Sequence, residues 1–397
     1  MSIKLVGGGS VNLLARLPPS NYAGNSNLRS GILCGGRSPW LRFPVSPIRV
    51  TINFYIREEA MSMAKVRVVQ YGCGPMGCGV VRFAWQRPDI EIVGAIDMDK
   101  NLVGRDLGEV SGLSEKLRIS ISDDAGAVLS QTKPDLVLLI TSSNVKRIYP
   151  QLEHCVKAGA NVVSTCEELS YPYRKEPAVS AEVDKIAKAN NVTVLATGVN
   201  PGFTMDTWPL FMTGVCQQVE QIRVRRIQNA SDRRSSLQKK IGAGCTREEF
   251  DKRVASGTTG HTGLYESIAM IAGGLGWELD NITESIEPVI AKNQVKTNFV
   301  TVRPGQVAGV SQVGKGIRRG KELIILEFEQ YVGTSSSDTV YITGTPNMEV
   351  VIKEGVQGDI ATAAIIVNSA HRVVQALPGL ITMKDLALVS ALGADVE

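Results

Sequence analysis

Continuous apolar runs separated by segments of helical spacing dominate the chain from about residue 65 to residue 205. The runs are short and bounded by breakers, as in strands buried on both faces of a parallel sheet. We expect such strands at residues 66–71, 91–96, 118–121, 135–141, 161–164 and 192–196. Helices are expected between them, at residues 80–85, 101–110, 124–131, 145–158 and 176–190. This alternation predicts an α/β fold of the Rossmann type, with a doubly wound parallel sheet.

The pattern changes after about residue 220. Residues 221–228 alternate apolar and cationic positions, as a half-exposed strand does. Further strands are expected at residues 278–290, 294–302, 322–331 and 339–342. They predict a second α+β domain that is built on a mostly antiparallel sheet. Residues 360–377 return to helical spacing, and we expect this segment to pack back on the first domain.

Three glycines stand where the first strand turns into the first helix. In Gly72-x-Gly74-x-x-Gly77, the first glycine permits a tight turn, the second lets a pyrophosphate approach the backbone, and the third lets the helix pack closely. A helix N-terminus favours negative charge, so Pro75 and Met76 belong to the same predicted phosphate site. The motif alone is weak, and a glycine-rich turn without a ligand is the plain alternative.

Asp97 supports the dinucleotide interpretation, because it ends a predicted strand about twenty residues beyond the glycines. An acidic group there binds the ribose 2′-hydroxyl and repels a 2′-phosphate, which favours NAD over NADP, although Lys100 softens this preference. We therefore divide the chain into four parts: an extension (1–62), a dinucleotide-binding domain (63–205), a substrate and oligomerisation domain (206–356) and a C-terminal helix that returns to the dinucleotide-binding domain (357–397).

Composition narrows the class of protein. A hydrophobic content of 43% over 397 residues is ordinary for a globular protein, and no apolar run approaches the length of a membrane span. The seven cysteines are scattered without a CxxC pair, and there are only three histidines, so we expect no metal site. A reducing, cytoplasmic compartment fits this cysteine usage best.

The net charge of +4 belongs to the N-terminal extension. Residues 1–57 hold seven basic and no acidic side chains, which leaves 36 basic against 39 acidic in the remainder and gives no indication of nucleic-acid binding. The extension has the Arg-rich, acid-poor composition of a transit segment. We favour another origin, in which it is sequence translated ahead of a true start at Met61 or Met63. In either case we expect little core there, with the segment disordered or outside the natural protein.

Three loops follow the carboxyl ends of predicted parallel strands, where open α/β sheets bind their ligands. Glu167 and Glu168 stand in the loop 164–168 as candidate general bases, although composition alone favours solvated loop charges. The loop 198–203 offers the side-chain amide of Asn200 to the same cleft. A polar loop expected beside a bound nicotinamide supplies Thr141, Ser142, Ser143 and Asn144.

Two further sites lie in the second domain. His261 stands in a glycine-rich loop that opens a helix, where a capping or structural histidine is the alternative to a functional one. Arg223 and Arg225 share one side of the strand at residues 221–228. They form either an exposed strand face or a fork that suits a substrate carboxylate.

Seven segments together resemble the 2,4-diaminopentanoate dehydrogenases and the related native amine dehydrogenases, within the dihydrodipicolinate reductase-like superfamily: KVRVVQYGCGPMG, GAID, TSSN, NVVSTCEELSYP, GVNPGF, GHTGL and PGLITMKDL. The resemblance runs from about residue 64 to residue 391, and STCEELSYP with GVNPGF is its specific part. Dihydrodipicolinate reductases carry a paired-histidine motif and a PSGT segment, where this chain reads RRIQNASDRRSSLQKKIGAG. Tetrahydrodipicolinate reduction is therefore not expected.

The resemblance implies NAD(P)-dependent oxidative deamination of an amine, with reductive amination of a ketone in reverse. The substrate it favours is 2,4-diaminopentanoate, which would yield 2-amino-4-oxopentanoate and ammonia. It also implies that Glu167 handles the amine with Glu168 as its neighbour, that His261 lies beside the substrate, and that Arg225 meets it. The alternatives are a C=N or C=C reductase of a biosynthetic intermediate and a non-catalytic NAD(H)-sensing regulator. A homodimer that covers the free face of the second sheet is expected as well.

Overall fold

The computed structural model describes residues 3–4, 10–11 and 65–393. The chain forms two compact units, Met1–Met61 and Ser62–Glu397. In the first unit, β1 (Ile3–Lys4) pairs antiparallel with β2 (Ser10–Val11). The expectations for the extension and for a start at Met61 or Met63 otherwise lie outside the described residues. All that follows concerns the second unit.

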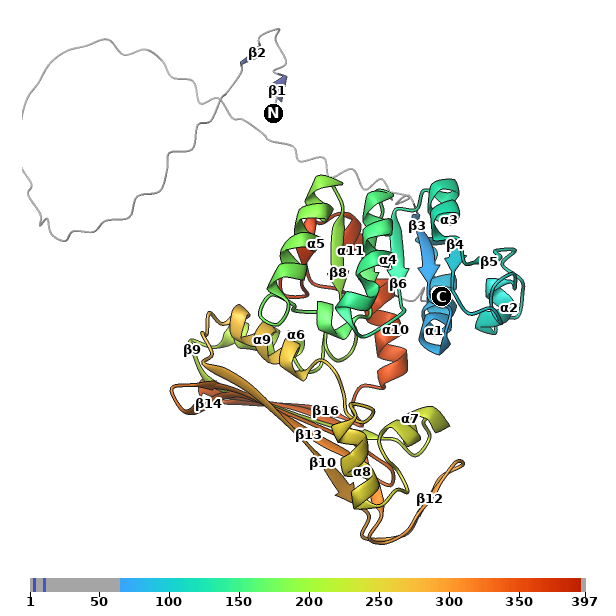
Figure 1. Cartoon of the computed structure of the whole chain (residues 1–397). Helices are drawn as coiled ribbons and strands as arrows, with labels where there is room; N and C mark the ends of the chain where they lie inside the picture. Colours follow the sequence, from blue (N-terminus) through green and yellow to red (C-terminus); the bar gives the residue numbers. More distant parts are fainter. Residues whose placement is uncertain (1–2, 5–9, 12–64, 394–397) are drawn as a thin grey trace, which may run out of the picture. The chain divides into compact units, whose positions relative to one another are not determined.

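A seven-stranded parallel sheet forms the first half of this unit, as the apolar runs predict (Figure 1). Its strand order is β17-β8-β7-β6-β3-β4-β5, and every pair of neighbours is parallel. The order reverses between β3 and β6, and ligands of open sheets bind in the crevice at such a reversal. The strands are β3 (Val66–Tyr71), β4 (Ile90–Ile96), β5 (Ile121–Ser122), β6 (Leu136–Leu139), β7 (Asn161–Ser164), β8 (Thr193–Ala196) and β17 (Gly379–Ile381).

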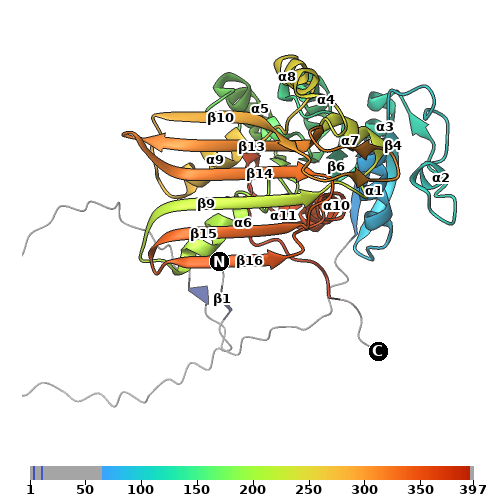
Figure 2. The same cartoon turned by 90° about the horizontal axis from the view of Figure 1, so that it is seen from below.

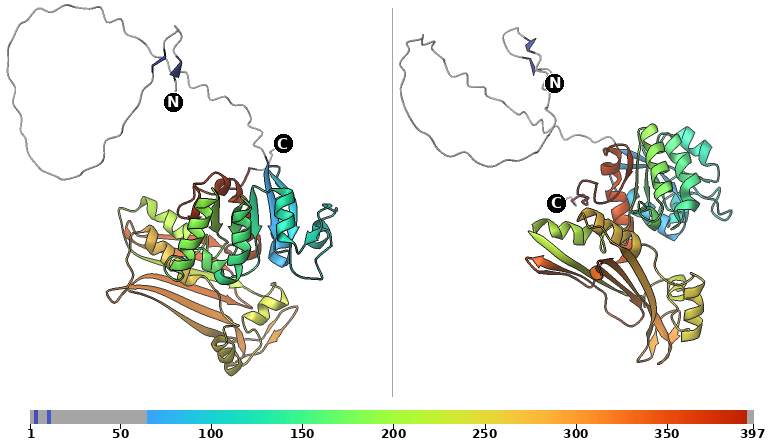
Figure 3. Two further views of the ribbon diagram at one scale, coloured as in Figure 1. Left: turned by 45° about the horizontal axis from the view of Figure 1, so that its top comes forward. Right: turned by 60° about the vertical axis from the view of Figure 1, so that its left-hand side comes forward.

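Helices cover both faces of the parallel sheet. One apolar core joins the sheet to α3, α4 and α5, and another joins its opposite face to α1, α10 and α11. Figure 3 (right) shows the green and the red helices on opposite sides of the strands. The elements of this half are α1 (Pro75–Trp85), α2 (Leu107–Ser111), α3 (Ala125–Thr132), α4 (Val145–Lys157), η1 (Glu167–Leu169), α5 (Pro177–Ala189), α10 (Gly358–Asn368) and α11 (Ala370–Val374). Helices α10 and α11, from the C-terminal part of the chain, thus pack on the first half.

A six-stranded sheet forms the second half, in the order β10-β13-β14-β9-β15-β16. Neighbours are antiparallel except β14 and β9, so the prediction of a mostly antiparallel sheet is confirmed. Helix α9 packs an apolar core on one face, and Figure 2 looks onto the other. The strands are β9 (Gln218–Asn229), β10 (Asn281–Ile290), β13 (Val307–Arg318), β14 (Lys321–Tyr331), β15 (Ser337–Thr345) and β16 (Met348–Lys353). Shorter elements complete it: α6 (Thr207–Met212), η2 (Thr213–Val215), α7 (Ser235–Lys240), α8 (Arg247–Ala255) and α9 (Leu264–Gly274).

The sequence pattern misses parts of this second half. The single strand expected at residues 294–302 is a hairpin of β11 (Val295–Lys296) and β12 (Thr301–Val302). Strand β13 is absent from the prediction because its glycines weaken the apolar signal. The packing requires those glycines, since a Cβ at Gly314 or Gly316 would lie 2.8 Å from the side chain of Ile268 in α9. Strand β16 is missed as well.

Within the part of the chain that the structure describes, no helix combines the length and the apolar character that crossing a membrane requires.

Candidate functional site

The glycine turn between β3 and α1 leaves a strip of backbone open. Gly72 has a φ of +95°, and a Cβ there would lie 2.1 Å from the carbonyl oxygen of Ile140. A Cβ at Gly77 would lie 1.9 Å from the carbonyl oxygen of Gly72. One at Gly74 would meet no atom of the described residues within 4 Å, its two chain neighbours aside. Helix α1 begins with no side-chain cap and no acidic residue in its first turn. This open, uncapped helix N-terminus fits the phosphates of a dinucleotide.

Asp97, directly after β4, lies beside this turn. Its Oδ2 accepts a hydrogen bond from the backbone N–H of Cys73 at 2.6 Å, and its Oδ1 accepts one from the N–H of Asp99 at 2.8 Å. The carboxylate therefore fixes the glycine turn against β4, at the position where an acidic residue would meet a ribose hydroxyl.

A cavity of about 460 Å³ opens beyond the carboxyl ends of β6, β7 and β8. The six-stranded sheet and the first turn of α10 supply its other walls. Seven of the residues predicted from the sequence line it: Met76, Thr141, Ser142, Ser143, Glu167, Asn200 and His261. The remaining residues of the glycine turn lie at the start of α1, while Asn144, Glu168 and Arg225 are not among the lining residues.

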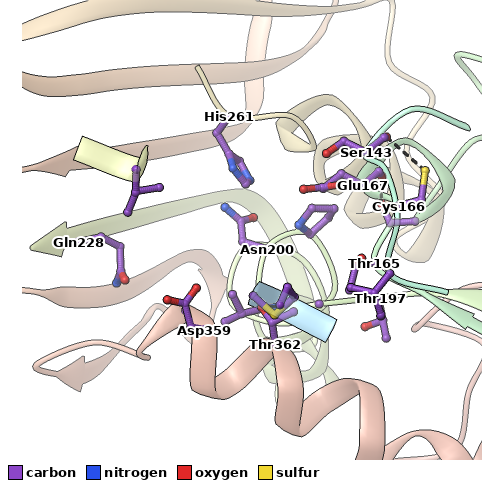
Figure 4. Close-up of a pocket in the computed structure, with 18 of the residues that line it drawn as sticks. Ser143, Thr165, Cys166, Glu167, Thr197, Asn200, Gln228, His261, Asp359 and Thr362 are labelled. Carbon is purple, nitrogen blue, oxygen red and sulfur yellow. Dashed lines mark hydrogen bonds between the residues drawn. The ribbon is translucent and has the colours of Figure 1, made fainter. Parts of the chain in front are cut away.

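Glu167 opens the short helix η1 at the carboxyl end of β7. Burial raises the pKa of its carboxyl group, and the hydroxyl of Ser143 and the ammonium of Lys240 oppose this shift. Figure 4 shows Glu167 and Ser143 together on one side of the pocket. A carboxylate with a raised pKa that faces a cavity is a stronger proton acceptor than an exposed one.

Glu168 has a different environment from its neighbour. Its Oε2 accepts hydrogen bonds from the side-chain amide of Asn144 at 2.9 Å and from the backbone N–H of Val145 at 3.0 Å. Asn144 in turn caps α4 by accepting from the N–H of Arg147 at 3.1 Å. These two predicted site residues therefore brace the loops that carry Ser143 and Glu167 and do not themselves line the cavity.

An ion cluster ties the Glu167 loop to helix α9. The ammonium of Lys175 lies 3.7 Å from Glu168 Oε1 and 3.2 Å from Glu266 Oε1. Glu266 is fully buried in α9, and burial raises the pKa of its carboxyl group. Helix α9 begins three residues after His261. The cluster therefore links the loop that carries Glu167 to the segment that carries His261.

His261 and Asn200 present free polar atoms to the cavity. The ring of His261 lies against Phe328, with centroids 4.8 Å apart, and its backbone exchanges two hydrogen bonds with the side chain of Gln312. Burial holds the pKa of His261 down to about 3, aided by the charges of Lys240 and Arg226, so the ring is neutral at physiological pH. Among the described residues, neither Nε2 of His261 nor either amide atom of buried Asn200 has a hydrogen-bond partner. Figure 4 shows these two side chains next to each other.

The structure corrects the prediction that Arg225 meets the substrate. Successive side chains of a strand point to opposite faces, and Arg223 and Arg225 lie on the exposed face of β9. There they pair with Glu327 and Glu329 of β14 at 2.8 and 3.0 Å. The arginine of β9 that lines the cavity is the next one, Arg226, which is 2% exposed.

Sequence reasoning also missed the end of the cavity opposite Glu167. Polar and charged residues gather there from β9, the β9–α7 connection, β14 and α10: Arg226, Gln228, Arg233, Arg234, Gln330, Asp359 and Thr362. One signal was present, because the apolar positions Ile222 and Val224 of β9 continue in phase to Arg226 and Gln228 on the same face. The contribution of α10 had no signal, since it arrives from far along the chain.

We expect replacement of Gly74 by alanine to weaken dinucleotide binding without unfolding the protein. The φ of −69° and ψ of −175° at Gly74 suit alanine, so stability should change by no more than about 0.5 kcal/mol. The new methyl group would stand where phosphates approach, and affinity should fall by about tenfold or more, which corresponds to about 1.4 kcal/mol. Titration calorimetry with NAD and thermal denaturation measure the two effects. Gly77→Ala is the matched control, because its new methyl group would clash with backbone and should lower the stability of the protein, unlike that of Gly74→Ala. Unchanged NAD affinity in Gly74→Ala would contradict the phosphate site.

Comparison with known proteins covers both halves of the described structure. Residues 66–170 match the family described as dihydrodipicolinate reductase, N-terminus, and residues 203–397 match the 2,4-diaminopentanoate dehydrogenase C-terminal domain. The chain is 36% identical over 343 residues to the 2,4-diaminopentanoate dehydrogenase of Acetoanaerobium sticklandii, across 84% of this chain and 96% of that protein. It is 25% identical over 358 residues to an amine dehydrogenase of Streptomyces virginiae, across 83% and 98%. The structure of an amine dehydrogenase from Mycobacterium smegmatis matches it with a TM-score of 0.72 at 27% identity, across 82% and 97% of the two chains.

Proposed function

Because the chain belongs to the 2,4-diaminopentanoate dehydrogenase family, we propose that it oxidatively deaminates 2,4-diaminopentanoate to 2-amino-4-oxopentanoate and ammonia. The reverse reaction would be the reductive amination of the ketone. One observation carries the proposal: the carboxylate of Glu167 faces the same cavity as His261 and Asn200, and that cavity reaches Met76 at the glycine turn. This shared cavity supports the role of Glu167 as proton acceptor next to a bound substrate and cofactor.

The cofactor is a nicotinamide dinucleotide, which when bound accepts a hydride from the carbon that carries the amine. We place its phosphates at Gly72, Gly74 and Gly77 and its nicotinamide beside residues 141–143. For the preference between the two forms we propose NAD, because Asp97 at the end of β4 would repel a 2′-phosphate.

Glu167 serves as the general base in this proposal. It first removes a proton from the substrate ammonium, so that the nitrogen lone pair can drive the hydride from the carbon. After releasing that proton to solvent, the Glu167 carboxylate takes a proton from the water that adds to the resulting iminium. It then returns this proton to the nitrogen of the carbinolamine, so that the C–N bond breaks, ammonia leaves, and loss of the hydroxyl proton gives the ketone. Neutral His261 and the amide of Asn200 orient the reacting groups by hydrogen bonds, and the enclosure by both halves of the unit limits the access of bulk water.

The test is reduction of NAD or NADP by the full chain with a panel of amines, followed by the absorbance of the reduced nicotinamide. The panel contains 2,4-diaminopentanoate, ornithine, alanine and simple alkyl amines. We expect fast reduction with 2,4-diaminopentanoate. Activity on alkyl amines alone would keep amine oxidation and reject the diamino acid. Silence across the panel, with NADH binding retained, would reject the proposal in favour of a C=N or C=C reductase or an NAD(H) sensor.

We also retain the proposal of a homodimer in a cytoplasmic setting. The second sheet has one face packed by α9, and its other face carries the ion pairs of Arg223 and Arg225. A second copy placed on that face would extend these charged contacts between chains. The six cysteines that the structure describes are free, which suits a reducing compartment.

A further inference from the structure

An ion pair stands at the end of the cavity opposite Glu167. Arg233 follows β9, Asp359 lies in the first turn of α10, and both line the cavity. Nη2 of Arg233 donates to Oδ1 of Asp359 at 2.8 Å. Figure 4 shows Asp359 and Gln228 on one side of Asn200, with Glu167 and Ser143 on the other.

Both members of this pair keep polar atoms available. The side chain of Arg233 is 15% exposed. Its Nε is buried and has no hydrogen-bond partner among the described residues. The Asp359 side chain is 42% exposed, and its Oδ2 makes no hydrogen bond within the described part of the chain. A buried guanidinium N–H without a partner is costly, because it has lost water without a replacement. The pair therefore offers one free donor and one free acceptor to a molecule in the cavity.

The buried arginine at this end, Arg226, already has hydrogen-bond partners within the protein. Arg226 donates to Asp338 at 2.6 Å and to the carbonyl of Val356 at 2.9 Å, and its charge is matched by Asp338. A carboxylate ligand would find fewer free donors on Arg226 than on Arg233. Arg234, at the start of α7, adds an exposed cation to the same wall.

We propose that Arg233 and Asp359 together bind the zwitterionic head of a 2-amino acid, with Arg233 holding the α-carboxylate and Asp359 the α-ammonium. This inference rests on the proposed function, and it identifies the residues that select a diamino acid over a simple amine. With the head held at this end, the second amine of the substrate extends past Asn200 toward Glu167. An adjacent cation and anion match such a head in both signs, which neither charge alone would do.

The first test measures binding without turnover. Norvaline has the 2-amino acid head but lacks the reacting amine, so it should compete with substrate or bind in calorimetry to the full chain with NADH. We expect Arg233→Met and Asp359→Asn each to weaken norvaline binding by about 10- to 100-fold, the usual range for a lost charged hydrogen bond. Arg225→Met, on the exposed face of β9, is the matched control and should bind norvaline as the unaltered protein does. Norvaline affinity that is unchanged in both cavity variants would overturn the inference.

The second test separates the two charges by substrate. 4-Aminopentanoate lacks the α-ammonium, so kcat/KM should fall in Arg233→Met and stay within about threefold of the unaltered protein in Asp359→Asn. Pentan-2-amine lacks both groups, and neither variant should lower its turnover. Equal losses on 2,4-diaminopentanoate, 4-aminopentanoate and pentan-2-amine would show a structural role for the pair and overturn the inference. If the unaltered protein oxidises no amine while the variants still bind norvaline more weakly, the proposed function fails. The site for the 2-amino acid head is then supported independently.

Discussion

Replacing Glu167 by glutamine is expected to lower turnover by about 100-fold or more, the usual effect of removing a general base. Glutamine keeps the shape and the hydrogen-bonding ability of the side chain, but it cannot take a proton from the amine or from water. The glycine turn lies on another loop, so the affinity for NAD should stay nearly unchanged. Steady-state kinetics with 2,4-diaminopentanoate and calorimetry with NAD measure the two quantities. Turnover near that of the unaltered protein would remove Glu167 from the mechanism.

The pH dependence of the unaltered protein gives an independent check on Glu167. Burial raises the pKa of this carboxyl group, and the base must be ionised to act. The kcat/KM should therefore decline as the pH falls through that raised pKa, and Glu167→Gln should lose this acidic limb. His261, with a pKa of about 3, stays neutral throughout and contributes no limb near neutrality. An acidic limb that persists in Glu167→Gln would assign it to another group.

Replacing Arg226 by methionine is expected to lower the free energy of unfolding by about 3–5 kcal/mol, as when one partner of a buried ion pair is removed. Arg226 and Asp338 are 2% and 0% exposed, and their nearest atoms are 2.6 Å apart. Without the guanidinium, the Asp338 carboxylate would stay buried and lose its counter-charge. Burial already raises the pKa of Asp338, and loss of Arg226 would raise it further. Urea denaturation followed by circular dichroism measures the change.

Arg225→Met provides the matched control for this stability measurement. Arg225 stands one position earlier on β9 and pairs with the carboxylate of Glu329, but its side chain is 45% exposed. Exposed ion pairs contribute about 0–1 kcal/mol, so its loss should be small. If Arg226→Met proved no more destabilising than Arg225→Met, the buried pair would contribute no more than an exposed one.

The parallel half of the fold could be predicted from sequence because its strands are short, continuous apolar runs. The predicted strands at residues 135–141 and 161–164 correspond to β6 and β7. The helix predicted at residues 124–131 corresponds to α3, where Asp124 accepts from the N–H of Ala127. The second half was harder to predict, because glycines of β13 contact α9 and the strand therefore has no apolar face in its sequence. The pattern of apolar and polar residues indicates where side chains are buried. It does not indicate a strand whose backbone forms the packing surface.

Part of the candidate site could likewise be predicted from the sequence, and part could not. Loops at the carboxyl ends of strands could be identified because strand order and direction follow from the alternation of elements, and they bring Ser143, Glu167 and Asn200 to one cavity. The family resemblance read from STCEELSYP and GVNPGF is confirmed by the comparisons. The resemblance implied Arg225, but in β9 a shift of one residue exchanges the faces, and Arg226 is the one on the buried side. Asp359 could not be found, since only the tertiary fold brings α10 to the cavity.

The place of α10 also bears on how the molecule is made. The face of the parallel sheet that contains Leu136, Val163 and Leu195 is covered by α10 and α11, and the edge strand beside β8 is β17, residues 379–381. A ribosome releases these segments only at the end of synthesis, after the entire second half has emerged. Until then the nucleotide-binding half has an uncovered apolar face and an open sheet edge, both of which invite aggregation. The half that is first in sequence is therefore completed last, and a chain cut after β8 would lack part of its own core.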